Sequence, residues 1–411
     1  MSTAVRIEAE RIVRRLREGG HEACFAGGCV RDMLLGKTPA DIDIATSARP
    51  QEIQRLFENT IPVGAQFGVV IVHTDAGDYE VATFRTESAY SDGRHPDHVA
   101  FATAKEDVLR RDFTINGMLY DPVADEILDW VGGEADLKNR TVRTIGDPDR
   151  RFDEDKLRLL RAVRFAARLE YAIEEETYAA MVRHAPELVA VSAERVRDEL
   201  VRIFTGDHAG RALRLLHDTG LLKPVLPEVE AMVGVEQPPQ FHPEGDVFEH
   251  TCQMFDHAEN PSPELAMGIL LHDVGKPGTQ RFEERIRFDE HDRAGEEIAG
   301  IICRRLRFSG EQTRQIVSLV GNHMRFSMAK RMKLSKLKAL LALPRFEEHL
   351  ELHRLDCIAS HGKLDIYNFI RQKMEEFGEE DISPAPLVTG HDLRDLGYPE
   401  GPQIGRILAA V

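Results

Sequence analysis

Two aspartates, Asp41 and Asp43, follow a glycine pair at Gly27 and Gly28 in the segment GGCVRDMLLGKTPADID. If the aspartates lie on a strand, their i, i+2 spacing places both carboxylates on one face. Adjacent carboxylates repel each other unless a divalent cation lies between them, and Mg²⁺ is commonly held by carboxylates together with substrate phosphates. The spacing therefore predicts a magnesium site that serves phosphoryl or nucleotidyl transfer.

The glycine pair and Arg31 form a candidate phosphate site beside these carboxylates. Gly27 and Gly28 let the backbone approach a ligand closely, and we expect a helix to begin directly after them. The N–H groups at a helix start favour phosphate, and Arg31 lies one turn further along. Alone, a glycine pair is more often a simple turn, and D-x-D is more often a solvated strand end. The complete string G-G-x-V-R-D-x8-D-x-D is much more specific.

This string resembles the signature of class II tRNA nucleotidyltransferases and bacterial poly(A) polymerases, members of the DNA polymerase β superfamily. The resemblance covers roughly residues 20–215 and includes DYEVATFRTE (78–87) and RRDFTINGMLYD (110–121). The family usually has Ala where this chain has Gly117, a change that removes no polar group.

The resemblance implies a role for one residue of DYEVATFRTE and for three residues of RRDFTINGMLYD. Glu80 would be a third carboxylate of the metal site. Arg111 would contact the triphosphate, Asp112 would hold the ribose 2′-hydroxyl, and Asn116 would support the nucleotide pocket.

The segment EDKLR (154–158) matches the amino-acid template with which this family selects the incoming base. On one helix, Glu154, Asp155 and Arg158 would lie close enough to present donors and acceptors together. Arg158 offers a planar donor fork and Asp155 a pure acceptor, so the pair can imitate a Watson–Crick partner. By itself E-D-x-x-R is usually a surface salt bridge. We expect Arg161 and Arg164 to line the same cleft.

A second group of chemistry-bearing residues lies beyond residue 240. The string LLHDVGKP (270–277) resembles the HD superfamily of metal-dependent phosphohydrolases. The resemblance implies that four residues bind one divalent ion: His250, His272, Asp273 and Asp356. His291 and His323 would complete a second site, and Lys276 would contact phosphate. Mixed nitrogen and oxygen ligands suit Mn²⁺, Ni²⁺, Fe²⁺ or Mg²⁺ better than a structural Zn²⁺. Whether this domain hydrolyses a substrate or only grips RNA stays open.

The elements that must position these residues change character near residue 145. Before it, β-rich runs at 67–73 and 79–84 flank the turn DAGD, and helical stretches are expected near 5–18 and 49–58. From Asp153 onward the apolar residues recur with a helical period. SAERVRDE (192–199) looks like the family's neck-helix motif, in which Ser192 caps the helix and Arg195 docks onto the template.

We therefore expect an α+β fold with an N-terminal polymerase β-like nucleotidyltransferase palm, followed by an all-α neck, body and HD domain. The expected division is palm 1–145, neck and body 146–240, HD domain 241–365 and C-terminal tail 366–411.

Composition limits the class of protein further. The chain has 411 residues and a net charge of −17. A negative net charge argues against a nucleic-acid partner, but the argument is weak here because Lys and Arg concentrate at 6–17 and 304–338. Five scattered cysteines without a C-x-x-C pair are typical of a reducing compartment. There is no membrane-length apolar run and no signal-peptide core, so we expect a cytoplasmic protein. Monomer and homodimer both stay open, as does whether the C-terminus is native.

The resemblance implies template-independent addition of CCA to the tRNA 3′ end from CTP and ATP with Mg²⁺, together with Mn²⁺ or Ni²⁺ in the HD domain. The nearest alternatives are A-adding, CC-adding and poly(A)-adding enzymes. RTESAYSDGRHPDH (85–98) resembles the flexible loop of full CCA-adding enzymes, which disfavours CC-only addition. Poly(A) polymerases usually carry a basic C-terminal extension that this sequence lacks, whereas A-only addition stays open.

Two alternatives come from other classes of protein. One is an HD phosphohydrolase with a nucleotide-sensing N-terminal domain, and the other is a non-catalytic tRNA-binding protein. The intact pair Asp41 and Asp43 argues against both.

Overall fold

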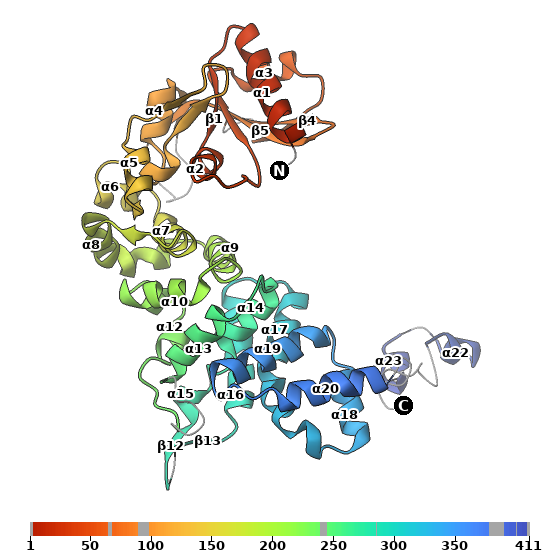
Figure 1. Cartoon of the computed structure of the whole chain (residues 1–411). Coiled ribbons are helices and arrows are strands. Elements are labelled where there is room, and N and C mark those ends of the chain that lie inside the picture. Colours follow the sequence, from red (N-terminus) through yellow and green to blue (C-terminus); the bar gives the residue numbers. More distant parts are fainter. Residues whose placement is uncertain are drawn as a thin grey trace.

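The computed structural model describes residues 3–64, 68–88, 98–238, 245–284, 286–377, 390–399 and 401–408. Within them, a seven-stranded sheet near the N-terminus is followed almost entirely by helices, which confirms the α+β fold class. Figure 1 shows an elongated, curved molecule with the sheet at one end, α7 to α10 in the middle and the later helices at the other end. The two candidate sites therefore lie in separate regions of the chain.

The large sheet has the strand order β3-β4-β5-β2-β1-β8-β9. In chain order, its strands are β1 (Ala23–Ala26), β2 (Asp43–Thr46), β3 (Thr60–Gly64), β4 (Val69–Thr74), β5 (Gly77–Thr83), β8 (Leu119–Asp121) and β9 (Glu126–Leu128). β2 pairs antiparallel with β1 and parallel with β5. The sequence predicted the β4–β5 hairpin, whereas β8 and β9, with three residues each, were missed because such short strands have no readable alternation.

Helices cover the sheet on both faces. α1 (Thr3–Glu18) and α3 (Pro50–Leu56) pack on the face that buries Phe25, Ile44 and Val81. α4 (Ala104–Leu109) belongs to a second apolar cluster on the opposite face, with Ala26 and Ala45. Because neighbouring residues of a strand point to opposite faces, positions 43 and 80 lie on the α4 side of the sheet.

The other elements up to residue 230 are short helices and small strands, several of which pack against α7. These elements are α2 (Gly28–Leu34), β6 (Arg85–Ser88), β7 (His98–Phe101), η2 (Thr114–Asn116), α5 (Gly133–Lys138), β10 (Thr141–Val142), α6 (Pro148–Glu154), α7 (Leu157–Arg168), β11 (Ala172–Ile173), α8 (Glu175–His184), η3 (Ala185–Ala190), α9 (Ala193–Phe204), α10 (Ala209–Asp218), α11 (Leu222–Val225) and α12 (Pro227–Glu230). The apolar stripe of α7 is buried against α9 and α10, as its helical period predicted.

The later helices include α14 (Pro263–Leu271), which is buried along its whole length. The other elements of this region are α13 (Val247–Asp256), α15 (Lys276–Thr279), β12 (Gln280–Phe282), β13 (Ile286–Phe288), α16 (His291–Arg305), α17 (Gly310–Asn322), η4 (His323–Arg331), α18 (Leu334–Leu341), α19 (Phe346–Ala359) and α20 (Asp365–Glu376). α13 packs on α10 and α14 on α9, so one apolar core continues from the sheet to this region. Two last helices, α22 (Gly390–Asp395) and α23 (Pro402–Leu408), pack on each other and lie to one side in Figure 1.

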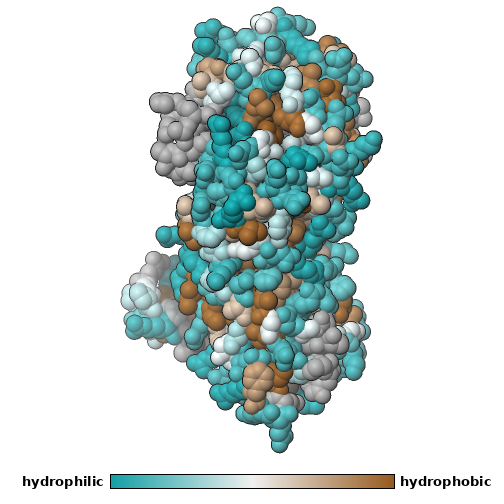
Figure 2. Space-filling view, turned by 90° about the vertical axis from the view of Figure 1, so that its left-hand side faces the viewer, coloured by the Kyte–Doolittle hydropathy of each residue, from teal (hydrophilic) through white to brown (hydrophobic). Residues whose placement is uncertain are grey.

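The described surface gives no sign of a transmembrane segment. Among the helices of the described ranges, none combines the length and the apolar character that crossing a bilayer requires. The face drawn in Figure 2 is mostly hydrophilic, and its hydrophobic residues form separate patches.

Candidate active site and metal centre

Three carboxylates lie near one another at the start of β2. Asp43 is the first residue of β2, and Glu80 occupies the neighbouring position of parallel strand β5. Asp41 lies before β2, so the prediction that both aspartates share a strand is wrong. Nevertheless, burial and the negative charges of Glu80 and Asp41 raise the pKa of Asp43 to about 6. A half-buried carboxylate with two acidic neighbours is stabilised by a cation, and a divalent metal ion fits this donor set.

The glycine turn lies directly against two arginines. Gly27 has a φ of 76° and precedes α2, which begins at Gly28 as the sequence predicted. A Cβ atom on Gly27 would lie 3.1 Å from Nη1 of Arg111, and one on Gly28 would lie 3.5 Å from Nη2 of Arg31. The turn therefore requires glycine at Gly27 for its backbone conformation and for the close approach of a guanidinium group.

A chain of hydrogen bonds connects Arg31 to the neck. Nη1 of Arg31 donates to Oδ1 of Asn116 at 2.7 Å, and Nδ2 of Asn116 donates to Oδ1 of Asp112 at 3.3 Å. Arg161 on α7 donates to Oδ2 of Asp112 through Nε at 2.8 Å and Nη2 at 2.5 Å. Four residues that the sequence singled out separately thus form one network between the sheet domain and α7.

Phe165, which the sequence did not single out, stands among three of the predicted arginines. The guanidinium carbons of Arg31, Arg161 and Arg164 lie 5.5, 5.4 and 4.5 Å from the centre of its ring. Arg164 also donates to Glu199 on α9 at 2.5 Å. The ring of Phe165 therefore provides an aromatic surface that holds these guanidinium groups in place beside the cleft. In the sequence it looks like any other member of the apolar stripe of α7, so no local signal distinguished it.

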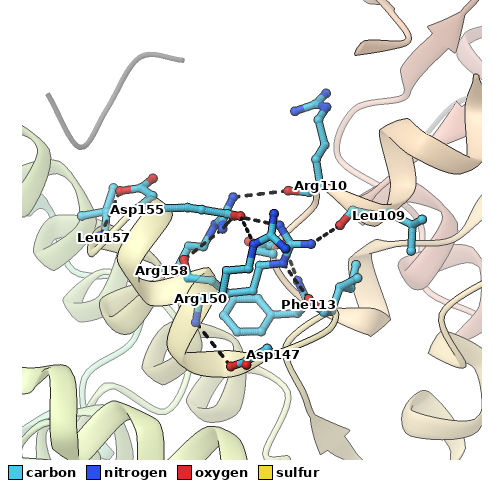
Figure 3. A network of polar contacts seen from close by, with 12 residues as sticks. Leu109, Arg110, Phe113, Asp147, Arg150, Asp155, Leu157 and Arg158 are labelled. Carbon is cyan, nitrogen blue, oxygen red and sulfur yellow. Dashed lines mark hydrogen bonds and ion pairs between the residues drawn. The ribbon is translucent and has the colours of Figure 1, made fainter. Parts of the chain in front are cut away.

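The template segment is not one helix, which corrects the prediction. α6 ends at Glu154, Asp155 has an extended backbone with φ −151° and ψ 105°, and α7 begins at Leu157. Nη1 of Arg158 still reaches Oε2 of Glu154 at 2.7 Å, while its Nη2 donates to the carbonyl of Arg110 at 3.3 Å (Figure 3). The Oδ1 atom of Asp155 accepts from the backbone N–H of Leu157 at 3.0 Å, so Asp155 and Arg158 have different hydrogen-bond partners.

The neck helix α9 holds Asp155 from the other side. Nη2 of Arg195 donates to Oδ2 of Asp155 at 2.8 Å, in agreement with the docking predicted for Arg195. Ser192 is the residue before α9, as expected, but its side chain forms no capping hydrogen bond.

Asp273 is the centre of the second cluster. It follows α14 and is buried, and Nε2 of His272 lies 2.9 Å from its Oδ2. Nε2 of His291 and of His323 lie 3.5 and 3.7 Å from its Oδ1. Nearby, Nε2 of His250 lies 3.2 Å from Oδ1 of Asp356, a residue of α19. All six predicted ligands are thus present in this region, which is a suitable donor set for one or two divalent transition-metal ions.

The orientation of the imidazole rings fits metal binding. Nδ1 of His272, His291 and His323 lies 2.9, 2.8 and 2.7 Å from the backbone carbonyls of Ile269, Phe288 and Val320. A carbonyl only accepts, so each Nδ1 carries the proton and each Nε2 keeps a lone pair.

These lone pairs face one another. Nε2 of His291 and Nε2 of His323 are 3.3 Å apart, and burial lowers the pKa of His323 to about 4. His323 is therefore neutral near pH 7, and a cation between the rings would relieve the repulsion between the lone pairs.

A cavity of about 370 Å³ opens on this cluster. Its walls include Asp273, His291, His323, Asp356 and Lys276. Nζ of Lys276 lies 2.6 Å from Oδ2 of Asp273, so an ammonium group suitable for binding an anionic ligand lies beside the histidine cluster.

Comparison with known families divides the chain into three matched regions. Residues 23–143 match the poly A polymerase head domain, and residues 170–233 match a probable RNA and SrmB-binding site of polymerase A. Residues 247–360 match the HD domain. The three regions contain, in order, the carboxylate cluster, α9 and the histidine cluster.

Curated relatives agree with these matches. The chain is 46% identical over 265 residues to the CCA-adding enzyme of Bacillus pumilus (strain SAFR-032), which covers 64% of this chain and 62% of that protein. It is 44% identical over 223 residues to the CCA-adding enzyme of Geobacillus kaustophilus (strain HTA426), which covers 54% of this chain and 55% of the relative. The matched part thus spans between about half and three fifths of the length of these relatives.

Solved structures extend the likeness over the whole chain. The CCA-adding enzyme of Bacillus stearothermophilus in complex with CTP has a TM-score of 0.73 and 28% identity, and the match covers 100% of this chain and 92% of that one. The Thermotoga maritima CCA-adding enzyme complexed with tRNA shares the fold, with a TM-score of 0.61, 19% identity and a match that covers 99% of this chain and 90% of that one. The chain thus combines a poly A polymerase head domain, a probable RNA-binding region of polymerase A and an HD domain, in this order, and it is similar in sequence and fold to CCA-adding enzymes.

Proposed function

We propose that this protein adds CCA to the 3′ end of tRNA, using CTP and ATP. The observation that carries the proposal is that three carboxylates and two arginines lie near the glycine turn. They are Asp41, Asp43, Glu80, Arg31 and Arg111. Carboxylates that bind a divalent ion, beside guanidinium groups that bind phosphates, suit transfer of a nucleotide from a triphosphate. The CCA-adding enzymes among its relatives support the same reaction.

In the proposed reaction, the tRNA 3′-oxygen forms a bond to the α-phosphorus of the nucleotide. The bond between the α-phosphorus and the bridging oxygen breaks, and pyrophosphate and a proton are released. Asp41, Asp43 and Glu80 would hold Mg²⁺, which when bound supplies positive charge at the reacting phosphate. Arg31 and Arg111 would hold the triphosphate, so that binding and orientation account for most of the catalysis.

Base selection would depend on Asp155 and Arg158. The carboxylate of Asp155 can accept from an amino group, and the guanidinium of Arg158 can donate to a ring nitrogen or carbonyl of the base. C and A each offer such a donor and acceptor on their Watson–Crick edge. Asp112, Asn116 and Arg161 would support the nucleotide through the network described above.

One experiment tests the proposed function. The protein is incubated with tRNA that lacks CCA, lacks only the terminal A or is complete, with CTP and ATP separately and together, and the 3′ ends are sequenced. CCA addition requires both C residues from CTP alone and the final A from ATP. Growth of A on complete tRNA would instead identify a poly(A) polymerase, and use of ATP on CC-ended tRNA without any C addition would identify an A-adding enzyme.

The segment between β6 and β7 contains the predicted switching loop, which argues against CC-only addition. Residues 89–97 of the predicted switching loop lie outside the described residues. We propose that deletion of part of the segment Ser88–His98 spares C addition and abolishes A addition, because such loops often carry the conformational step between two substrates. Equal loss of both additions would make the segment a structural connection only.

A second proposed activity is hydrolysis of a phosphate ester by the HD domain. The carrying observation is the cavity of about 370 Å³ that contacts both the histidine cluster and Lys276. With Mn²⁺ or Ni²⁺ at the cluster, a phosphate in this cavity would meet both the ion and the ammonium group. The test is an assay of the protein, loaded with each metal, on a panel of nucleoside 2′,3′-cyclic phosphates and phosphomonoesters. If the metal-loaded protein hydrolyses neither class of substrate, the proposed activity is rejected.

We also propose the division into palm 1–145, neck and body 146–240, HD domain 241–365 and C-terminal tail 366–411, with tRNA as partner and the cytoplasm as location. All five cysteines are buried and free, which is compatible with a reducing compartment. Limited proteolysis with mapping of the cleavage sites would test the division, and light scattering would distinguish monomer from homodimer.

A further inference from the structure

Asp107 is a buried carboxylate in the short helix α4, with only 2% of its surface exposed. Its Oδ2 accepts hydrogen bonds from Nε and Nη2 of Arg111, at 3.3 and 3.0 Å. Its Oδ1 accepts from Nε and Nη2 of Arg110, at 3.0 and 2.7 Å, and from the backbone N–H of Arg85 at 3.2 Å. One carboxylate thus accepts five hydrogen bonds from three residues.

The contacts with Asp107 fix which part of Arg111 faces the candidate nucleotide site. The Nε–Nη2 edge of the guanidinium group is taken by Asp107, so Nη1 is directed elsewhere. Nη1 lies 3.1 Å from the position of a Cβ atom on Gly27 and 3.5 Å from the carbonyl of Asn116. The positive charge of Arg111 is also close enough to oppose the rise in the pKa of Asp43. Asp107 therefore presents one end of Arg111 to the cleft that contains the metal-site carboxylates.

Two further contacts connect α4 and its C-cap residue to other parts of the candidate site. The carbonyl of Arg110 accepts from Arg158 of the template segment, as the dashed line between them in Figure 3 shows. The N–H of Arg85 is the first of strand β6, where the β6–β7 hairpin begins. The side chain of Asp107 is thus the common acceptor for the triphosphate arginine, the residue that touches the template and the base of the hairpin.

We propose that Asp107 is a positioning residue for nucleotide binding, which orients Arg111 toward the triphosphate and fixes the α4 turn against the template and the β6–β7 hairpin. The inference rests on the proposed nucleotidyl transfer. It predicts an effect on CTP and ATP alike, because both nucleotides carry the same triphosphate.

The charge of Asp107 supports this role. Burial raises the pKa of its carboxyl group, but Arg110 and Arg111 outweigh that effect and hold the pKa below its ordinary value. The group is therefore ionised at neutral pH and forms charge-assisted hydrogen bonds. Asp107→Asn keeps the shape of the side chain but removes the charge and replaces one acceptor oxygen by a donor.

Asp136 offers a matched control. It is a buried aspartate in α5 that accepts from Nε of Arg143 at 3.0 Å and from Oγ1 of Thr114 at 2.7 Å. Asp136→Asn therefore removes a comparable buried charge in the same region, but it leaves the acceptor of Arg111 in place.

The test measures CTP binding by calorimetry in Mg²⁺, and KM and kcat for CTP and ATP addition, in the whole protein. For Asp107→Asn, we expect CTP affinity to fall and KM for both nucleotides to rise by about tenfold or more, with a smaller change in kcat, because Arg111 loses its fixed orientation. Asp136→Asn should leave both quantities near wild type at a similar loss of melting temperature. Equal effects of the two variants on KM would overturn the inference and reduce Asp107 to a structural residue.

A double-mutant cycle with Arg111→Lys separates orientation from general stability. A lysine side chain lacks the planar fork that Asp107 holds, so Asp107→Asn should have a much smaller effect on CTP affinity in the Arg111→Lys background. The same fold-change in both backgrounds would contradict the proposed role. A wild-type protein that binds CTP without adding it to tRNA would reject the proposed function, while the binding measurements would still decide the role of Asp107.

Discussion

Nη2 of Arg195 lies 2.8 Å from Oδ2 of Asp155, so a residue of α9 holds the only extended residue between α6 and α7. Without this contact, the carboxylate of Asp155 would keep only its local hydrogen bond from the backbone N–H of Leu157, at 3.0 Å. α9 therefore contributes to the geometry of the proposed template as well as to the core.

The first prediction concerns base choice. Arg195→Ala should increase incorporation of GTP and UTP relative to CTP and ATP, as should Asp155→Ala, because both changes leave the acceptor of the template without a fixed direction. The measurement is competition between nucleotides at the tRNA 3′ end. Arg202→Ala, on the same helix but with an exposed side chain, is the control. A loss of stability without any change in base choice would show that Arg195 only holds the neck together.

The second prediction concerns the carboxylate cluster. Asp41→Ala or Asp43→Ala should abolish nucleotide addition while the fold is retained, because each removes a proposed metal ligand. Addition measured at more than about a tenth of the wild-type rate would contradict the metal assignment. Circular dichroism provides the control for folding.

The third prediction concerns the same cluster in the absence of metal. The pKa of Asp43 is raised from 3.8 to about 6 in the folded protein. Ionisation of Asp43 therefore lowers the free energy of unfolding as pH rises from about 4 to 6, and the full loss is present above pH 6. With a chelator at pH 7.5, Asp43→Asn should therefore increase the free energy of unfolding, by on the order of 2 kcal/mol. The difference should vanish below pH 4, and urea unfolding at both pH values measures it.

The fourth prediction concerns His349, which is 1% exposed and lies beside Phe326, with ring centres 6.5 Å apart. Burial, together with the charge of Arg325, lowers its pKa to about 4. The unfolded chain then binds more protons between pH 6.5 and 4, so stability should fall as pH decreases through this range. His349→Leu should lose this share of the pH dependence, at most about 3 kcal/mol. Parallel stability curves for the two proteins would show that His349 does not titrate as described.

The fifth prediction concerns the histidine cluster. The double change His272→Ala with Asp273→Ala should remove bound transition metal and any phosphate-ester hydrolysis but spare CCA addition, because the carboxylate cluster lies in another region of the chain. Elemental analysis of protein purified without chelator measures the metal. His257→Ala, at an exposed position just after α13, is the control. If the wild-type protein takes up neither Mn²⁺ nor Ni²⁺, the domain is an RNA-gripping scaffold.

The sequence by itself identified the residue types of both sites. Gly27 and Gly28 were recognisable because they precede Arg31 and the two aspartates in one specific string, and Asp41 and Asp43 because two close carboxylates imply a cation. The helical half was equally readable, since an amphipathic stripe such as that of α7 recurs with the period of a helix.

Tertiary structure decided how those residues combine. The break at Asp155 could not be predicted, because it depends on Arg195, 40 residues later, and on contacts of Arg158 with the distant Arg110. The same holds for Phe165 and Asp107, which look in sequence like a core aromatic and a helix-surface acid. Their roles arise only when the fold places arginines from different segments around them, since charge and stacking act through space and not along the chain.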